Sequence, residues 1–397
     1  MGQIPRSILA VGLVSFLTDV SSEMIYPLLP VFLVGVLGAT PTIFGLIDGT
    51  AETVAALLKW ASGYWTDLFS KRKLLMGIGY SLSSLIRPLV GLANTWPFVF
   101  FCRVADRVGK GIRTAPRDAL IADITEPSLR AKAYSIHRSM DHAGALTGPI
   151  IATLLLLIPG MTVKNVFLLA IIPGILSILV IYFFVEESEK KIGDAKEKPG
   201  NPIKDLKKMG SQFHLLITAV FIFALGNSSD AFYLLRLKEV GVSETWIPLV
   251  WALHSGVKML SVYFMGPLSD KKGHLNMIQL GWTLNTLILI SFCFVDSRDG
   301  LIALFLVYGA YYGLVEAPER AWISTVAPAH LKGSAFGLFH MVTGLAFLPA
   351  NLLFGWIWTK WGAPFAFFTA AIFSAIALVM LAKMNGRGAK NTPNPIS

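Results

Sequence analysis

The residues with the clearest chemical potential form a run of cations inside an apolar stretch, FFCRVADRVGKGIRTAPRDALIAD (residues 100–123). A helix places these cations on one face, within about 120° of one another. They are Arg103, Arg107, Lys110, Arg113 and Arg117. Near the centre of a bilayer each charge costs roughly 2.5–3.5 kcal/mol, so a lipid-facing position is excluded. The stripe must face water, a ligand or opposite charges, and it can bind an anionic group.

Carboxylates on neighbouring apolar stretches are the natural partners of this stripe. Asp19 and Glu23 lie four residues apart, on one helix face, and they are the most central acids available. Asp48 and Glu52 have the same spacing on the next stretch. A carboxylate beside a cation in a dry cavity can change its protonation state when substrate or water arrives, which favours proton coupling. Alternatively the charges, Arg87 included, only neutralise one another as part of the architecture.

Composition places these residues in a membrane protein. The 397 residues are 54% hydrophobic and 15% charged, whereas a soluble domain carries about 25% charged residues. Apolar stretches long enough to cross a bilayer recur along the chain. The predicted spans are residues 8–36, 42–69, 73–93, 97–120, 132–158, 163–185, 213–236, 245–269, 276–295, 300–323, 333–358 and 363–383.

The distribution of charge between the spans predicts their orientation. Lys and Arg concentrate in alternate loops and in a polar linker at 186–211, which separates residues 1–185 from residues 212–397. By the positive-inside rule the linker and both termini are cytoplasmic. This asymmetry accounts for most of the net charge of +10, so no nucleic-acid partner is expected.

The chain also contains an internal repeat. Three blocks recur in the same order at offsets of 203, 202 and 207 residues. They pair GYWTDLFSKRKLL (63–75) with GPLSDKKGHLNMI (266–278), APRDALIADITEPSLRAKAYSIHRS (115–139) with APERAWISTVAPAHLKGSAFGLFHM (317–341), and SSEMIY (21–26) with SSDAFY (228–233). The repeat predicts an all-α membrane protein with twelve transmembrane helices in two pseudo-symmetric six-helix bundles.

The third pair of blocks places Glu23 and Asp230 at matching positions, each followed by a tyrosine, Tyr26 and Tyr233. The serines before each acid, and Pro27, predict locally opened helices that can face a water-filled cavity. We expect the two acids to take part in proton coupling and the two tyrosines to contact substrate. Helix capping or hydrogen bonding between helices is the alternative for these groups.

The repeat of the cationic stretch carries aromatic side chains instead of the stripe. Tyr308 and Tyr312 stand there, with Glu316 near the predicted cytoplasmic end. A ligand that fits a cationic wall and an aromatic wall would combine an anionic or zwitterionic group with an apolar or planar part. Simple packing of the tyrosines is the alternative.

The duplicated six-span unit resembles the major facilitator superfamily of secondary transporters. The loop between its second and third helices reads G-x-L-x-D-R-x-G-R-K. The matching residues here are Gly63, Asp67, Arg72 and Lys73, and in the second copy Gly266, Leu268, Asp270, Lys271 and Gly273; Leu68 and Ser70 depart from the pattern. The resemblance implies that these loops gate the cytoplasmic face, and solvation of a simple loop is the alternative.

The same resemblance implies that the first, fourth, seventh and tenth helices line a central cavity. The fourth-helix motif has an arginine where Arg103 stands, which implies a proton-relay role, while Asp106 and Arg107 depart from the motif. In the fifth predicted span, GALTGPIIA (144–152) resembles the G-x-x-x-G-P-x-x-G motif of drug:proton antiporters. Gly144, Gly148 and Pro149 match it, and Ala152 replaces the last glycine.

The prediction is a proton-coupled secondary transporter that moves a small anionic, zwitterionic or amphipathic molecule by alternating access. We expect substrate binding by Arg107, Lys110 and Arg113, export across a bacterial inner membrane, and a monomer whose partners are substrate, protons and lipids. The alternatives are a proton-coupled importer of an anionic nutrient or polycarboxylate siderophore, and a receptor or lipid-binding protein that transports nothing. The sequence has no phosphate-binding loop and no Cys/His cluster, so we expect no enzyme activity, cofactor or metal.

Overall fold

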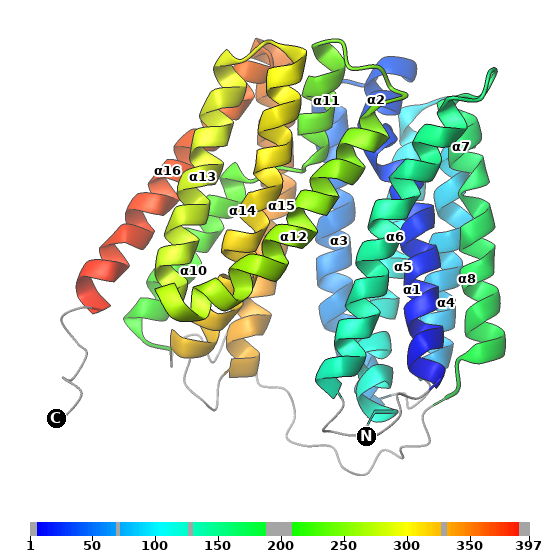
Figure 1. Cartoon of the computed structure of the whole chain (residues 1–397), viewed down its shortest axis with the longest axis horizontal. Helices are drawn as coiled ribbons and strands as arrows, with labels where there is room; N and C mark the ends of the chain where they lie inside the picture. Colours follow the sequence, from blue (N-terminus) through cyan, green and yellow to red (C-terminus); the bar gives the residue numbers. More distant parts are fainter. Residues whose placement is uncertain (1–5, 69–71, 126–129, 188–208, 327–331, 389–397) are drawn as a thin grey trace. The chain divides into compact units, whose positions relative to one another are not determined.

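The computed structural model describes residues 6–68, 72–125, 130–187, 209–326 and 332–388. Within these ranges the regular elements are helices, with no strand among them (Figure 1). Most of the predicted linker, residues 188–208, lies outside the described part. The fold is therefore all-α, as the sequence predicts.

The chain divides into two compact units. Met1–Glu197 and Ser229–Ser255 form the first unit, and Lys198–Ser228 and Gly256–Ser397 form the second. The complete helices of the first unit are α1 (Arg6–Ile25), η1 (Tyr26–Leu28), α2 (Leu29–Val31), η2 (Phe32–Val36), α3 (Pro41–Leu68), α4 (Arg72–Ile86), η3 (Arg87–Leu92), α5 (Trp96–Asp123), α6 (Arg130–Leu156), α7 (Val163–Leu169), α8 (Ile171–Phe184) and α11 (Ala231–Glu239).

The second unit contains the other helices. They are α10 (Ser211–Gly226), α13 (His274–Phe294), α14 (Arg298–Val326), α15 (Lys332–Trp361) and α16 (Ala363–Gly388), together with the part of α12 (Ile247–Lys272) that begins at Gly256. Residues 229–255 thus follow the predicted linker in sequence and belong to the first unit by their contacts.

Nine helical stretches of the described chain are long and apolar enough to cross a membrane. They are Ser7–Val36, Arg72–Leu92, Val163–Phe184, Ser211–Glu239, Ile247–Met265, His274–Phe294, Arg298–Ile323, Ala335–Trp361 and Ala363–Lys383. Three further helices, α3, α5 and α6, have 28, 28 and 27 residues. These three contain the charged residues that the sequence places in the second, fourth and fifth spans, which lowers their apolar character.

Two of the predicted spans contain breaks where serine and proline occur. The first α-helix ends at Ile25 and continues as the 3-10 turn η1, which contains Pro27. Proline lacks a backbone N–H and cannot continue the hydrogen-bond ladder of an α-helix. Between α10 and α11 the chain leaves helical conformation at Asn227, with φ −107° and ψ 78°. The first break lies at the end of the block SSEMIY, and the second lies at the start of SSDAFY.

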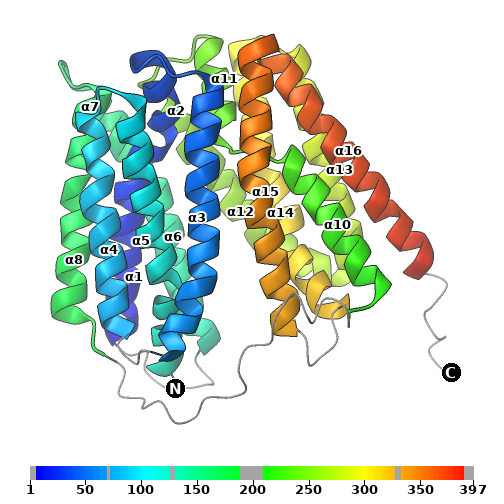
Figure 2. The same cartoon turned by 180° about the vertical axis from the view of Figure 1, so that it is seen from behind.

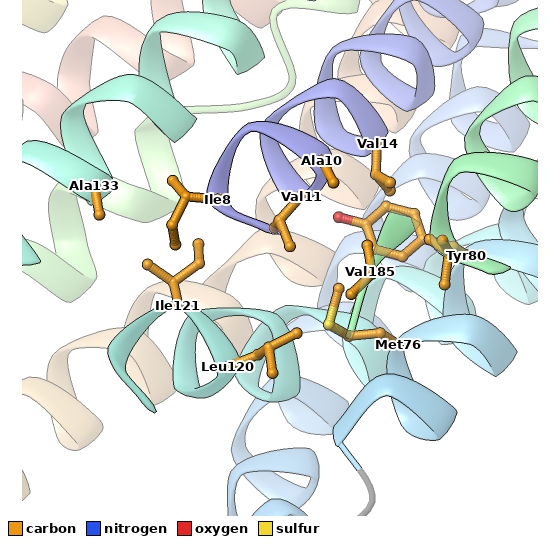
Figure 3. Packing of buried hydrophobic residues seen from close by; sticks show 11 residues of the cluster. Ile8, Ala10, Val11, Val14, Met76, Tyr80, Leu120, Ile121, Ala133 and Val185 are labelled. Atoms are coloured by element: carbon orange, nitrogen blue, oxygen red, sulfur yellow. The ribbon is translucent and has the colours of Figure 1, made fainter. Parts of the chain in front are cut away.

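The apolar core of the first unit gathers five of its elements near the N-terminal end of α1 (Figure 3). The residues come from α1, α4, α5, α6 and the end of α8, and they are Ile8, Ala10, Val11, Val14, Met76, Tyr80, Leu120, Ile121, Ala133, Ile181 and Val185. Apolar packing at this end fixes the helices so that the polar part of α5 can be held beside α1, α3 and α4. Figure 2 shows α5 between α3 and α4, the two helices that it contacts most extensively.

Candidate functional site

The cationic face of α5 meets an acidic face of α3 in two matched ion pairs. Arg103 Nη2 lies 2.8 Å from Asp48 Oδ1, and Arg107 Nε lies 2.8 Å from Glu52 Oε1. Both partners recur every four residues, so two turns of one helix face two turns of the other. Both arginines are buried. The partners of these arginines therefore come from α3, and not from the α1 acids that the sequence suggests as the most central.

A third carboxylate, Asp106 on α5 itself, holds an arginine on the α4 side. Asp106 Oδ1 accepts hydrogen bonds from Nη2 and Nε of Arg87, at 2.7 and 3.0 Å. The Nη1 group of Arg87 donates to the backbone carbonyl of Thr18 on α1, at 3.1 Å. The other carboxylate oxygen lies 3.6 Å from Arg103 and 3.8 Å from Arg107. Three arginines and three carboxylates thus balance in charge inside the first unit.

The two acids of α1 lie beside these ion pairs and have partners of a different kind. Asp19 and Glu23 are half-buried, and within the described residues neither forms an ion pair closer than 4 Å. Glu23 Oε2 instead accepts a hydrogen bond from Trp251 Nε1 at 2.8 Å. Lys110 is also half-buried and lies within electrostatic reach of both acids. These groups can take up a proton or a ligand charge without first breaking an ion pair.

The glycines of the antiporter-like motif lie directly against the two α1 acids. A Cβ atom at Gly144 would stand 2.9 Å from Asp19 Cβ, and one at Gly148 would stand 3.0 Å from Glu23 Cβ. Each would also approach a backbone carbonyl of α1, at 2.5 and 2.6 Å. Pro149 lies inside the same helix, α6. The motif therefore allows α6 to approach the α1 backbone at the height of both carboxylates.

The lower part of the cationic stripe has aromatic and hydroxyl partners. The Arg113 guanidinium lies 4.2 Å from the centroid of the Tyr80 ring. The Tyr80 hydroxyl is 3.4 Å from Ser15 Oγ, which lies 2.8 Å from Nε2 of the buried His137. Arg117 is bonded to Asp118 beside it, with both contacts at 2.9 Å. Sequence reasoning missed Tyr80 and Ser15, because single polar groups in apolar stretches are indistinguishable from packing residues.

The matched tyrosine and serine blocks meet within the first unit. The Tyr26 hydroxyl lies 3.1 Å from Ser229 Oγ, and the Arg103 guanidinium lies 5.2 Å from the centroid of the Tyr26 ring. Asp230 is the half-buried N-cap residue of α11, and Tyr233 is buried one turn later. The structure thus brings Tyr26 together with Arg103 and with Ser229, the residue before Asp230.

In the second unit the predicted tyrosines, Tyr308 and Tyr312, meet edge to face in an aromatic cluster that also contains Tyr311. The hydroxyls of Tyr308 and Tyr312 lie 3.4 Å apart, and Lys258 Nζ is 3.6 Å from the centroid of the Tyr312 ring. Glu316 is more peripheral, with 41% of its side chain exposed, and it pairs with Arg320 at 3.3 Å. The cluster can bind a planar or cationic group, and Lys258 already uses one ring face in this way.

The predicted gating residues are described only in part. Those without described side-chain surroundings are Gly63, Asp67, Gly266 and Asp270. Arg72 forms an ion pair with Asp123 at the end of α5 and donates to the carbonyl of Ala119 at 2.7 Å. Lys271 is exposed near the end of α12. Arg72 is therefore bound to its own unit in this structure.

These charges inside helices of membrane-spanning length are typical of a transport protein, and comparison with known proteins identifies the family. The family model described as Major Facilitator Superfamily matches residues 11–350 and 237–396. The chain belongs to the Major Facilitator Superfamily. Its members are multi-pass membrane transporters of small molecules and not enzymes, so this superfamily member is a transporter.

Two relatives match most of the length of the chain. An uncharacterized MFS-type transporter of Methanocaldococcus jannaschii is 32% identical over 385 residues, covering 96% of this chain and 95% of the relative. Multidrug resistance protein MdtH of Proteus mirabilis is 25% identical over 331 residues, covering 82% of this chain and 79% of that protein.

Two solved superfamily structures have the same fold. A bacterial homolog of the human lysosomal transporter Spinster has a TM-score of 0.79 at 16% identity, with 100% of both chains covered. The nucleoside transporter NupG has a TM-score of 0.81 at 11% identity, covering 95% of this chain and 99% of that one. At these identities the likeness concerns the fold alone.

Proposed function

We propose that this superfamily member is a proton-coupled secondary transporter that exports a small amphipathic or zwitterionic molecule by alternating access. One observation carries the proposal: Asp19 and Glu23 are half-buried without ion pairs among the described residues, next to a cluster whose other charges are paired. Ionisable groups inside a membrane bundle mark proton or substrate pathways. The proton carriers in this proposal are the two α1 carboxylates.

The charge balance of the first unit supports the substrate class. Arg103 and Arg107 are neutralised by Asp48 and Glu52, so the positive charge left for a ligand comes mainly from Lys110, with Arg113 buried against an aromatic ring. A site that offers one accessible cation beside two carboxylates suits a zwitterion or an amphipathic amine better than a polyanion. Arg103 takes a structural part in this proposal, as the partner that orients Asp48.

The direction of transport is supported by the motif around Gly144 and Gly148 and by relatives that carry multidrug resistance names. In the proposed topology α3, α5 and α6 cross the membrane in addition to the nine apolar stretches, giving twelve spans with cytoplasmic termini. In this proposal the two six-span halves of the duplicated sequence are residues 1–185 and 212–397, joined by the linker at 186–211, and residues 229–255 of the second half pack in the first unit. The positive-inside pattern of the loops supports a bacterial inner-membrane orientation.

The test is proton movement in inside-out membrane vesicles that carry an acid-inside gradient. We expect norfloxacin, an amphipathic zwitterion, or ethidium, an amphipathic cation, to release protons from vesicles that contain the transporter. Asp19→Asn and Glu23→Gln should each reduce this release at least tenfold, because an amide cannot carry the proton. Substrate exchange in the absence of a gradient should persist in both variants.

Asp299→Asn is the matched control, because Asp299 is an exposed acid of α14 and should leave the release unchanged. Full proton release in both α1 variants would remove these acids from the relay. The alternative importer makes the opposite prediction in right-side-out vesicles, where an inward proton gradient should drive accumulation of citrate, a polycarboxylate. Lys110 supports the importer, because a cation that has no close ion pair within the described residues can bind a substrate carboxylate.

A further inference from the structure

Residues 229–255 belong to the first unit by their contacts, although residues of the second unit lie on both sides of them in the sequence. They follow α10 of the second unit, yet they pack in the first unit. The chain enters this segment through the non-helical residues after Gly226 and leaves it inside α12, between Ser255 and Gly256. Within the segment, α11 packs against α2, at the end of the unit opposite to the start of α1 (Figure 1).

The first polar anchor of the segment is Asp48. Ser229 Oγ donates to Asp48 Oδ2 at 2.6 Å, while Asp48 Oδ1 accepts from Arg103 Nη2 at 2.8 Å. The Ser229 hydroxyl is also 3.1 Å from the Tyr26 hydroxyl. Asp48 and Ser229 are 1% and 2% exposed, so water cannot replace these bonds readily. The Asp48 carboxylate therefore joins α3, α5 and Ser229, which lies two residues before the start of α11.

The second polar anchor is Glu23. It accepts the indole N–H of Trp251 at 2.8 Å, and the Trp251 ring lies 5.3 Å from the ring of Tyr26. Apolar contact adds to both anchors, because the buried Phe232 meets Phe44 edge to face at 4.9 Å. The segment is thus attached at its beginning and near its end by hydrogen bonds to carboxylates.

Hydrogen bonds to an ionised carboxylate are roughly twice as strong as those between neutral groups. A proton on the carboxylate removes this advantage and turns one acceptor oxygen into a donor, which an indole N–H cannot use. Asp48 faces Arg103 in a close ion pair, whereas within the described residues Glu23 has no ion pair closer than 4 Å. The two anchors therefore differ in how they respond to protons.

Other titratable and charged groups surround these two carboxylates from every neighbouring element. They are Asp19, Tyr26, Arg103, Asp106, Arg107 and Lys110 of α1, η1 and α5, Glu52 of α3 and Asp141 of α6, with Asp230 beside Tyr26 and His254 stacked on Trp251.

We infer that residues 229–255 form a latch in which Asp48 is the positioning residue and Glu23 is the proton-responsive one. The ion-paired Asp48 holds Ser229 at the start of α11 in every protonation state of Glu23. A proton on Glu23 weakens the bond to Trp251 and loosens the latch, so proton uptake at the α1 acid is converted into movement of the segment. The inference rests on the proposed proton coupling for its role in transport, but the latch itself can be measured without substrate.

The experiment is hydrogen–deuterium exchange of the full-length protein in lipid nanodiscs, without substrate or gradient. In the wild type we expect the amides of 231–239 to exchange roughly tenfold faster at pH 5.5 than at pH 7.5, after correction for intrinsic exchange. Glu23→Gln should show the faster exchange at both pH values, because the amide imitates the protonated acid. Asp48→Asn should raise exchange at both values and keep the dependence on pH.

The region 163–184, in the same unit, is the internal control and should not change in any variant. Unchanged exchange over 231–239 in both Glu23→Gln and Asp48→Asn overturns the inference. If Asp48→Asn loosens the control region as well, Ser229→Ala and Trp251→Phe decide, because they remove the same bonds from the segment side and leave the ion pairs intact. Unchanged exchange in these two variants also overturns it. A latch that responds as expected in a protein that moves no protons would refute the proposed function and not the latch.

Discussion

The helices α5 and α14 are repeat equivalents that share their packing and differ in their chemistry. Gly111 of α5 and Gly313 of α14 are 202 positions apart, and each allows a neighbouring helix to approach. A Cβ at Gly111 would overlap Leu58 of α3, and a Cβ at Gly313 would overlap Ser261 of α12. Both copies of the repeat thus have a close helix crossing at the equivalent glycine.

The side chains between these crossings have diverged. Asp106, which binds Arg87 in the first unit, corresponds to Tyr308, which lies 5.6 Å from Tyr311 in a parallel stack. Arg117 corresponds to Glu319, which accepts a hydrogen bond from Trp282 at 3.1 Å. The comparison teaches that the scaffold depends on the small residues, while the charged interior is particular to one copy. The predictions below compare the effects of substitutions in the two copies.

The largest effect is expected at Asp106. Asp106→Asn leaves Arg87 buried without its counter-charge, which costs about 3–5 kcal/mol when one member of a buried ion pair is removed. Tyr308→Phe, at the equivalent position of α14, removes a hydroxyl with long contacts of 3.4 and 3.5 Å and should cost less than about 1 kcal/mol. Thermal unfolding in detergent measures both. Equal losses would mean that charge does not distinguish the two helices.

An intermediate effect is expected at the shared glycines. Gly111→Ala and Gly313→Ala should each destabilise the protein by about 1–3 kcal/mol, because the added methyl group overfills a close helix crossing. Gly35→Ala is the control, since no atom lies within 4 Å of a Cβ built there. The same unfolding assay applies. A neutral result at only one of the two glycines would show that the crossings are not equivalent.

The smallest effect is expected for the exposed pair of α14. Glu316 and Arg320 are 41% and 53% exposed and lie four residues apart, so Glu316→Gln should cost no more than about 0.5 kcal/mol. This difference should vanish in 1 M salt, whereas the loss in Asp106→Asn should persist, because a buried pair is screened much less. A salt-independent loss at Glu316 would contradict the assignment of this pair to the surface.

Much of the fold follows from the sequence because it depends on local patterns. The predicted spans at 42–69 and 97–120 lie close to α3 (Pro41–Leu68) and α5 (Trp96–Asp123), since apolar content and helical spacing are visible in one segment at a time. The acids that pair with α5 were also visible as carboxylates four residues apart. The breaks near Pro27 and before Asp230 followed from proline and serine.

What the sequence could not supply is the choice of partners across helices. Nothing in the spacing tells whether Arg103 pairs with Asp48 or with Glu23, because that choice depends on which helix face is nearer. The bond between Trp251 and Glu23 joins residues 228 positions apart, and a tryptophan in an apolar span gives no sign of a polar contact. The assignment of residues 229–255 to the first unit likewise depends on tertiary contacts, which the sequence does not reveal.

The contact of Gly144 and Gly148 with α1 has a mechanical consequence. Because backbone meets backbone there, α1 has no clearance to turn about its own axis or to slide along α6. Any movement that changes the side of the membrane from which the two carboxylates are reached must therefore move both helices together, as a rigid pair. Mutations that adapt the protein to new cargo are then best tolerated on helices other than these two.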